Sequence, residues 1–559
     1  MSYDYDVCVI GSGAGGGPVA LELAQAGKSV LVLEKGPWLT EKDFYKDELA
    51  CCRRSVYTPE LKNEKHVIEE QYKDGNWYGE STEESGWDFW NGNVVGGSSN
   101  FMSGFFYRLK PKDFRLYSEF GAIKGANIAD WPISYEELEP YYTKAESEVG
   151  ISGQVEQHKH LEPRSSKTYP YPPTVEHPIV KNIDKACEQL GLDALKTPRA
   201  ILSKPDKGRK SCEYSGYCGS YGCSSGAKGS SRAALLNRAI KTGNCKILAN
   251  AKVVKIKSDN KGNVSSVQYF DESDIKKSVS AKIVVVACQA IETSRLLLAS
   301  TGAKHPNGLG NNHNQLGKNL LFSAGGSGTG EFTYSKLDKL TADQLKIRGP
   351  FVNRGLQEWY FINDKKMGGE IKGGTIDFLL RHPNAISKAM SLKRDENDKL
   401  VWGKDLKNKM KSTFESTQDL RFEVFNDWLP TDNCFVSLDK NVKDKWGSAV
   451  AKVRIGYHPH DLVIGEYLSK KAVTVLKKMG AENIHYNVSG SPPANLLAGG
   501  CRFGKNIETS VLDASCKLHD ADNLYVTDGS FMPTGGSVPF TWTIYANSFR
   551  VADIIKSRL

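Results

Sequence analysis

Residues 6–16, DVCVIGSGAGG, join a short apolar run to a glycine-rich segment of the form G-x-G-x-x-G. The apolar run is typical of a buried strand, the block from Pro18 to Ala26 has apolar residues at helical spacing, and residues 29–33, SVLVL, predict a second strand. A strand, a glycine turn, a helix and a parallel strand within about 30 residues form the βαβ unit that binds dinucleotides.

Three glycines and one acidic residue carry the chemistry of this unit. Gly11 permits a tight turn, Gly13 lets a pyrophosphate approach the backbone, and Gly16 lets the helix pack closely on the strand. The N-terminus of the helix favours the phosphate charge. Glu34 ends the second strand, where a carboxylate can hold two ribose hydroxyls and disfavours a 2′-phosphate. The unit therefore predicts FAD or NAD, and the alternative is a glycine-rich turn without a ligand.

Composition excludes several classes of protein. The 559 residues are 39% hydrophobic and 25% charged, which is typical of a globular protein with room for several domains. Lysine and arginine (74) exceed aspartate and glutamate (65) only mildly, and no basic run is interleaved with aromatics, so no nucleic-acid partner is expected. The longest strongly apolar stretch, residues 283–288, is far shorter than the about 18–20 residues of a spanning helix, so the protein is not expected to be integral to a membrane.

The rest of the chain contains two kinds of pattern. The expected strands of the first half lie at residues 246–248, 252–256, 264–270 and 282–287, with a hairpin turn at 260–263 and a helix at 290–300. Residues 349–382 and 422–457 alternate apolar and polar side chains at strand spacing, and residues 461–479 predict one long amphipathic helix. Residues 393–411, rich in Lys and Asp, are expected to be a solvated insertion.

Three further segments bear on the choice of dinucleotide. They are residues 94–99 (VVGGSS) followed by Arg108 and residues 113–114, residues 131–142 (WPISYEELEPYY), and residues 523–534 (NLYVTDGSFMPT). Together with the N-terminal motif, and in matching order, these segments resemble the glucose-methanol-choline (GMC) oxidoreductase family, which implies FAD. In that family the Gly-Gly-Ser-Ser loop lies against the flavin and the Asp-Gly-Ser segment contacts the FAD ribityl and pyrophosphate. The resemblance thus assigns cofactor contacts to Gly97, Ser98, Asp528 and Gly529.

The same resemblance implies the fold class and the domains. We expect an α/β protein with a doubly wound, Rossmann-like FAD-binding domain made of residues 1–325 and 488–559, which includes a cysteine loop at 211–228. A substrate domain built on a large antiparallel sheet is expected at residues 326–487.

The chain departs from the family at two positions that matter for catalysis. The family's proton-accepting His corresponds to Leu496, and the His or Asn that follows the Pro-Thr-x-Gly-Gly stretch corresponds to Pro539. Neither side chain accepts a proton, so another base is required, or the chain is a catalytically degenerate FAD-binding subunit. We expect His460, or else His458, to replace the base at the end of a predicted strand, and Asn495 to orient a substrate oxygen. The alternatives are that the two histidines cap a helix or face solvent, and that Asn495 is an ordinary turn residue.

Three cysteines are clustered in a glycine-rich loop. Cys212, Cys218 and Cys223 follow the spacing C-x5-C-x4-C. Three thiolates without a fourth ligand suit a three-iron, four-sulfur cluster better than a closed zinc site. The loop resembles that of the family's electron-transferring sugar dehydrogenases, whose large subunits pair flavin with such a cluster and pass electrons to a cytochrome. A local disulfide with one free thiol, or zinc, are the alternatives.

The function expected from this resemblance is FAD-dependent oxidation of a sugar or glycoside hydroxyl, with hydride moving to flavin N5. FAD is expected to bind non-covalently, because no His lies between Gly96 and Phe106, where some members tether it. Electrons are expected to reach an acceptor protein, and the alternative is an alcohol oxidase that uses oxygen. The N-terminus has no recognisable export signal. The chain could therefore stay cytoplasmic, or reach the periplasm with a small accessory subunit that carries the signal.

Overall fold

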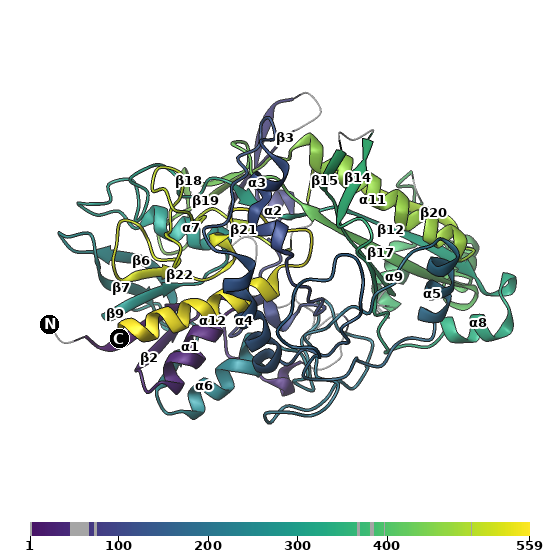
Figure 1. The fold of residues 1–559 in the computed structure, drawn as a ribbon, viewed down its shortest axis with the longest axis horizontal. Helices are drawn as coiled ribbons and strands as arrows, with labels where there is room; N and C mark the ends of the chain where they lie inside the picture. Colours follow the sequence, from purple (N-terminus) through teal and green to yellow (C-terminus); the bar gives the residue numbers. More distant parts are fainter. Residues whose placement is uncertain are drawn as a thin grey trace.

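The computed structural model describes residues 3–44, 48, 66–71, 75–365, 369–380, 385–395, 397–492 and 495–559. A five-stranded parallel sheet organises one half of the molecule (Figure 1). Its order is β22 (Leu524–Val526), β9 (Ala281–Val286), β1 (Tyr5–Ile10), β2 (Val30–Leu33) and β5 (Cys245–Leu248), with all four neighbouring pairs parallel. The predicted βαβ unit is confirmed, with α1 at Gly16–Gln25 between β1 and β2.

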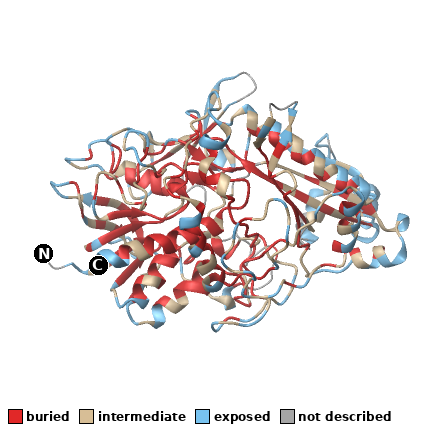
Figure 2. Cartoon of the chain, viewed as in Figure 1, coloured by how far each residue is buried: buried red, intermediate tan, exposed pale blue. Residues whose placement is uncertain are grey.

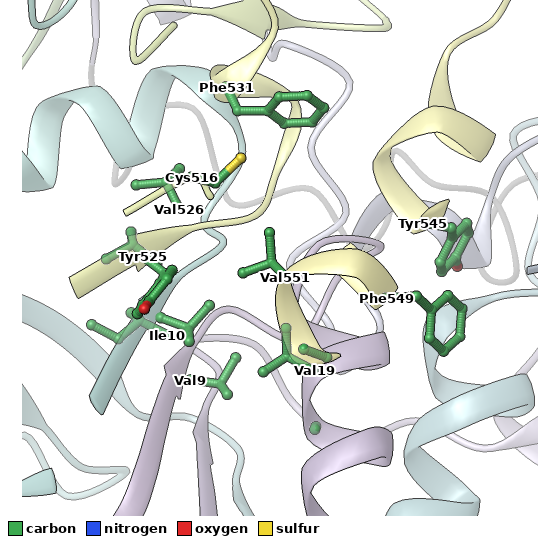
Figure 3. Close-up of a cluster of buried hydrophobic side chains, with 14 of the residues drawn as sticks. Val9, Ile10, Val19, Cys516, Tyr525, Val526, Phe531, Tyr545, Phe549 and Val551 are labelled. Carbon is green, nitrogen blue, oxygen red and sulfur yellow. The ribbon is translucent and has the colours of Figure 1, made fainter. Parts of the chain in front are cut away.

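Two different layers cover this parallel sheet. On one side lie α1, α6 (Asn237–Lys241) and the C-terminal helix α12 (Thr541–Arg558). A three-stranded antiparallel sheet of β6 (Lys252–Ser258), β7 (Val264–Phe270) and β8 (Lys276–Val279) packs against β9. Figure 3 shows how Val9, Val19, Val526 and Val551, from β1, α1, β22 and α12, meet in one buried cluster. The two ends of the chain therefore share a single core.

A large antiparallel sheet organises the other half, as predicted. Its order is β13 (Arg354–Leu356), β16 (Gly374–Leu380), β17 (Thr417–Asp427), β12 (Gly326–Thr333) and β20 (Glu482–Val488), with β11 (Ser323–Ala324) also paired to β17. The long helix α11 (Pro459–Lys478) covers one face, which confirms the helix predicted at 461–479. Side chains on β17 alternate, so that Leu420, Phe422 and Val424 are buried in the cluster beneath α11. The intervening side chains face the parallel-sheet half of the molecule.

Two strands that fall within the expected substrate domain pack against the other half of the molecule. β18 (Phe435–Lys443) and β19 (Ala449–Ile455) fall within the expected substrate domain at residues 326–487. They instead form a four-stranded sheet with β3 (Val67–Gln71) and β4 (Trp77–Ser81), and this sheet lies against α7 (Ala290–Ala299) of the FAD-binding half. The physical reason is burial, because apolar side chains of β18 and β19 join Ile68 and Ile291 in one cluster.

Shorter elements complete the fold, and Figure 2 shows buried residues concentrated in the sheets and the helices packed on them. The remaining helices are α2 (Thr82–Ser85), α3 (Leu116–Phe120), α4 (Tyr135–Ala145), α5 (Val180–Gln189), α8 (Lys339–Leu345), α9 (Ala385–Ser391) and α10 (Gly403–Lys411), and the remaining strands are β10 (Leu320–Leu321), β14 (Phe361–Asp364), β15 (Gly369–Lys372) and β21 (Ala498–Gly499). α10 has no buried residue, in agreement with a solvated insertion. Among the described residues, no helix has the length and apolar character that crossing a bilayer requires.

Candidate active site

A cavity of about 900 Å³ runs from the glycine-rich turn after β1 to the face of β17 opposite α11. Its walls include residues 10–15, the loop at 89–106, the start of α7, residues 495–497 and residues 539–541. This volume lies in the range of sites that bind cofactors and small molecules. The cavity therefore joins the predicted dinucleotide site to the antiparallel sheet.

The three motif glycines meet different steric demands. A Cβ atom on Gly11, whose φ is +96°, would lie 2.2 Å from the carbonyl oxygen of Ala287, and a Cβ on Gly16 would lie 2.0 Å from that of Gly11. These two glycines are therefore required by the fold itself. A Cβ on Gly13 would meet no atom within 4 Å, and Gly13 lines the cavity. The space beside Gly13 is what a pyrophosphate needs.

Glu34 lies at the end of β2, as predicted, and lines the cavity. Its Oε2 accepts hydrogen bonds from the backbone N–H (3.1 Å) and hydroxyl (2.6 Å) of Ser12, and its Oε1 accepts one from the N–H of Gly36 (3.0 Å). A carboxylate has about four acceptor sites, so one remains for a ribose hydroxyl. Ser12 Oγ also accepts a bond from the N–H of Gly96 at 2.8 Å, which ties the glycine-rich turn to the next motif.

The Gly-Gly-Ser-Ser segment forms a tight turn on the same wall. Gly96 and Gly97 both have positive φ, and a Cβ on Gly97 would lie 3.2 Å from Cα of Gly13. Ser98 lines the cavity while its hydroxyl donates to the carbonyl of Trp90 at 3.0 Å. The structure therefore brings Gly97 and Ser98 beside the glycine-rich turn. Non-glycine side chains would strain this turn and fill the space next to it.

Asp528 is held by a dense set of donors. Its Oδ1 accepts bonds from the backbone and hydroxyl of Ser530, and its Oδ2 accepts from the N–H of Gln289 and the hydroxyl of Thr293. Burial raises the pKa of this carboxyl, while these hydrogen bonds act in the opposite direction. Asp528 and Gly529 both line the cavity. The residues present thus fit FAD, with Gly13, Glu34 and Asp528 as the groups that would hold it.

Comparisons with known proteins agree with this geometry. Residues 72–322 and 430–548 match the N- and C-terminal models of the GMC oxidoreductase family, and residues 6–40 match an FAD binding domain. The chain belongs to the GMC oxidoreductase family. It is a member that binds FAD, so the cofactor predicted from the βαβ unit and the later motifs is confirmed.

Relatives of this GMC oxidoreductase span its whole length. It is 30% identical to 2-methyl-1,2-propanediol dehydrogenase of Mycolicibacterium austroafricanum (99% of this chain, 95% of that one) and 28% identical to 6'''-hydroxyparomomycin C oxidase of Streptomyces lividus (99% and 92%). It is 26% identical to the fructose dehydrogenase large subunit of Gluconobacter japonicus (99% and 98%). Among solved structures, pyridoxine 4-oxidase from Mesorbium loti shares the fold, with a TM-score of 0.63 at 16% identity over 99% of both chains.

The two departures from the family pattern both lie at the cavity. Leu496 and Pro539 line it, together with Asn495. Leu496 has a φ of +59°, a left-handed conformation that a leucine rarely adopts. None of the described side chains that line the cavity is a histidine or a tyrosine. The usual imidazole is therefore absent from the described wall as well as from the motif.

His458 and His460 do not lie at a strand end beside the cavity, where we expected them. They lie at the start of α11. His458 is the N-cap of α11, and its Nδ1 accepts a bond from the N–H of His460 at 3.2 Å. Its Nε2 donates to the carbonyl of Lys124 at 2.9 Å. Burial lowers the pKa of His460. Neither histidine lines the cavity, because Pro459 starts the helix immediately rather than prolonging a strand.

Sequence reasoning missed the polar residues on the opposite wall. Gln418, Arg421 and Glu423 of β17 line the cavity, and Arg421 Nη2 lies 3.2 Å from Glu423 Oε1. The signal was the alternation within residues 417–427, which gives the strand one apolar and one polar face. Alternation alone does not say which face a cofactor meets.

The three clustered cysteines line a second cavity of about 110 Å³. No disulfide joins any two of them, so the expected alternative of a local disulfide is wrong. Burial raises the pKa of the Cys212 thiol to about 12. Among the described residues, no three His, Cys, Asp or Glu side chains are arranged to hold a single metal ion. Ser103, Phe105 and Gly219 belong to the walls of both cavities.

Proposed function

We propose that this GMC oxidoreductase oxidises a hydroxyl group of a sugar or glycoside. The observation that carries the proposal is the single cavity that joins the FAD-binding residues to the polar face of β17. Bound FAD would supply the two-electron oxidant that takes a hydride from the substrate carbon at flavin N5. Gln418, Arg421 and Glu423 offer donors and acceptors that suit a ligand rich in hydroxyl groups.

The names of the relatives support this substrate class. A propanediol, an aminoglycoside and fructose appear in the names of the three relatives, and all three molecules carry several hydroxyl groups. Sugars and glycosides are therefore the first compounds to test, and simple diols the next.

The proposal includes an acceptor protein, of the cytochrome type, rather than oxygen. It rests on similarity to a dehydrogenase large subunit and on the cysteine cavity, which shares wall residues with the larger cavity. A three-iron, four-sulfur cluster on Cys212, Cys218 and Cys223 is part of this proposal. Thiolates of a cluster bind separate irons, so they need not converge on one point as the ligands of a single ion do.

Anaerobic titration of the oxidised holoenzyme with a panel of sugars and polyols tests the activity. Loss of the oxidised flavin absorbance with one of them is expected. An oxidised spectrum with every compound would support the degenerate FAD-binding subunit instead. Air added to the reduced enzyme separates the acceptors, because an oxidase would reoxidise within one turnover time and release peroxide, and a dehydrogenase would need an added one-electron acceptor.

Iron and acid-labile sulfide in freshly purified protein test the cluster. Both are expected in the wild-type protein and in the Cys245→Ser variant, whose thiol lies on β5. They should be lost from Cys218→Ser and Cys223→Ser. An iron-free wild-type protein would contradict the proposed cluster without contradicting the proposed hydroxyl oxidation.

A further inference from the structure

We propose that Glu423 accepts the proton of the substrate hydroxyl, in place of the imidazole that Leu496 and Pro539 cannot supply. This inference rests on the proposed hydroxyl oxidation. It assigns the base to the substrate wall of the cavity instead of the two loops where the family places it.

The position of Glu423 follows from the alternation of β17. Phe422 and Val424, on either side of it, are buried beneath α11, so the Glu423 side chain projects from the other face of the sheet. There it lines the cavity with 29% of its side chain exposed. β17 ends at Asp427, whose Oδ2 accepts a bond from the hydroxyl of Ser537 at 3.3 Å. The strand therefore leads from the segment of Pro539 into the cavity.

The other carboxylates on the described cavity wall already have partners in the dinucleotide half. Glu34 is bonded to Ser12 and Gly36, and Asp528 accepts four hydrogen bonds. Glu292 is paired with Arg295 at 3.1 Å and with Lys252 at 3.4 Å. Glu423 is the carboxylate that faces the cavity from the antiparallel sheet. The described wall contributes no imidazole or phenol, and lysine and arginine are already protonated at neutral pH.

Charged groups around Glu423 set its affinity for a proton. Arg421, on the same face, favours the ionised form at 3.2 Å, whereas burial raises the pKa of Glu423. Across the sheet, Asp377 on β16 and Ser327 on β12 are its direct partners in register. Asp377 is a fully buried carboxyl whose Oδ1 accepts bonds from the hydroxyls of Tyr107 and Thr197, both at 2.8 Å. Burial and the charge of Glu423 both raise the pKa of Asp377, so this neighbour holds a proton more tightly than an exposed aspartate does.

In the proposed step, a proton and a hydride leave the substrate. The hydroxyl O–H bond breaks and a carboxyl O–H bond forms on Glu423, which becomes neutral. The substrate carbon loses its hydrogen with both bonding electrons to the flavin, the oxidant of the proposed function, and the carbon–oxygen bond becomes a double bond. A neutral Glu423 then returns its proton to water at the cavity mouth before the next substrate binds. Arg421 stays protonated throughout and holds the carboxylate in place.

The test compares the rate of anaerobic flavin reduction in Glu423→Gln and wild type at equal FAD content. Loss of a positioned base predicts a fall of about 100-fold to 10,000-fold. The matched control is Glu331→Gln on neighbouring β12, whose carboxylate accepts a bond from Asn483 at 3.1 Å and does not line the cavity, and whose rate should be that of wild type. A wild-type rate in Glu423→Gln would overturn the assignment while leaving the proposed function intact. A wild-type enzyme that no hydroxyl compound reduces would overturn the proposed function, and the assignment with it.

Two further measurements complement the rate of Glu423→Gln, and the first needs no turnover. Infrared difference spectra of the oxidised holoenzyme between two pH values should contain a carboxyl band that is absent in Glu423→Gln and present in Glu331→Gln; identical spectra of all three proteins would overturn the assignment. In Glu423→Ala, added formate should restore part of the lost reduction rate by occupying the vacated space. Absence of rescue, with FAD content and thermal unfolding at wild-type values, would favour a structural role and also count against the assignment.

Discussion

Thr527 donates a hydrogen bond from its hydroxyl to the backbone oxygen of Gly15 at 2.8 Å, across a sequence separation of 512 residues. Ser548 of α12 donates to the same oxygen. A Cβ on Gly15 would lie 2.7 Å from the backbone nitrogen of Asp528, so no side chain fits between the two segments. The C-terminal part of the chain therefore closes the glycine-rich turn that β1 begins.

This relationship predicts a non-additive pair of variants. In Thr527→Val, Ser548 still satisfies the Gly15 oxygen, and the loss in the free energy of unfolding should be about 0.5–1.5 kcal/mol. In the double variant with Ser548→Ala, a buried carbonyl oxygen loses both donors, which adds a desolvation cost of about 1–3 kcal/mol. Denaturant unfolding of the four proteins measures both. A double variant that equals the sum of the singles would contradict the shared acceptor.

Gly13 and Gly16 should respond differently to the same methyl group. Gly13→Ala adds a Cβ that meets nothing within 4 Å, so thermal unfolding of the apoprotein should be unchanged, whereas FAD affinity should fall about tenfold or more because the methyl occupies cofactor space. Gly16→Ala places its Cβ 2.0 Å from the oxygen of Gly11 and should destabilise the apoprotein itself. Calorimetry of both apoproteins, with FAD titration, separates the effects. Unchanged FAD affinity in Gly13→Ala would contradict the predicted site of the pyrophosphate.

The cofactor half was predictable because its determinants are local. Gly11, Gly13, Gly16 and Glu34 lie within 24 residues, and each meets a demand of one βαβ unit or of the cofactor expected there. Glu423 was not predictable in the same way, since its strand shows alternation but its neighbours in space come from remote segments. The same limit applies to β19, whose parallel pairing with β3 joins residues nearly 400 positions apart.

Variants of His458 and His460 test whether either histidine is the base that the sequence led us to expect. Because neither lines the cavity, His460→Ala should keep the wild-type rate of flavin reduction. His458→Ala removes the N-cap of α11, which should lower the free energy of unfolding by about 1 kcal/mol without a specific loss of rate. Stopped-flow reduction together with denaturant unfolding checks both. A hundredfold slower reduction in either stable variant would return the base to this segment.

Asp377→Asn should change how stability depends on pH. Burial raises the pKa of Asp377 to about 7, so the folded protein binds this proton more tightly than the unfolded chain does. The free energy of unfolding should therefore fall as pH rises from about 4 to about 7, and the Asn variant should lack this contribution. Relative to wild type, the variant should be more stable at pH 8 than at pH 4, by on the order of 1 kcal/mol or more. Parallel pH profiles from urea unfolding would contradict the raised pKa.

Lys372 and Lys112 form a matched pair of ionic contacts with opposite burial. Lys372 donates to Asp113 inside the protein, where both side chains are at most 8% exposed, whereas Lys112 meets Glu370 at 3.1 Å on the surface. Lys372→Met removes the cationic partner of the buried Asp113 carboxylate, which keeps only the hydrogen bonds from Tyr360 and the N–H of Lys110, and should cost about 3–5 kcal/mol. Lys112→Met should cost less than about 1 kcal/mol. If denaturant unfolding gave the two variants the same loss in the free energy of unfolding, the buried pair would contribute no more to stability than the exposed pair.

The parallel sheet is assembled from both ends of the chain, and this imposes an order on biosynthesis. β2 ends at residue 33, but α12, which packs on α1, begins only at residue 541. At about 5–20 residues per second, a ribosome needs roughly 25–100 s to make the intervening chain. During that time the apolar face of α1, including Val19, lacks its final covering. A chaperone that protects the nascent N-terminal segment would therefore act before any flavin can be retained.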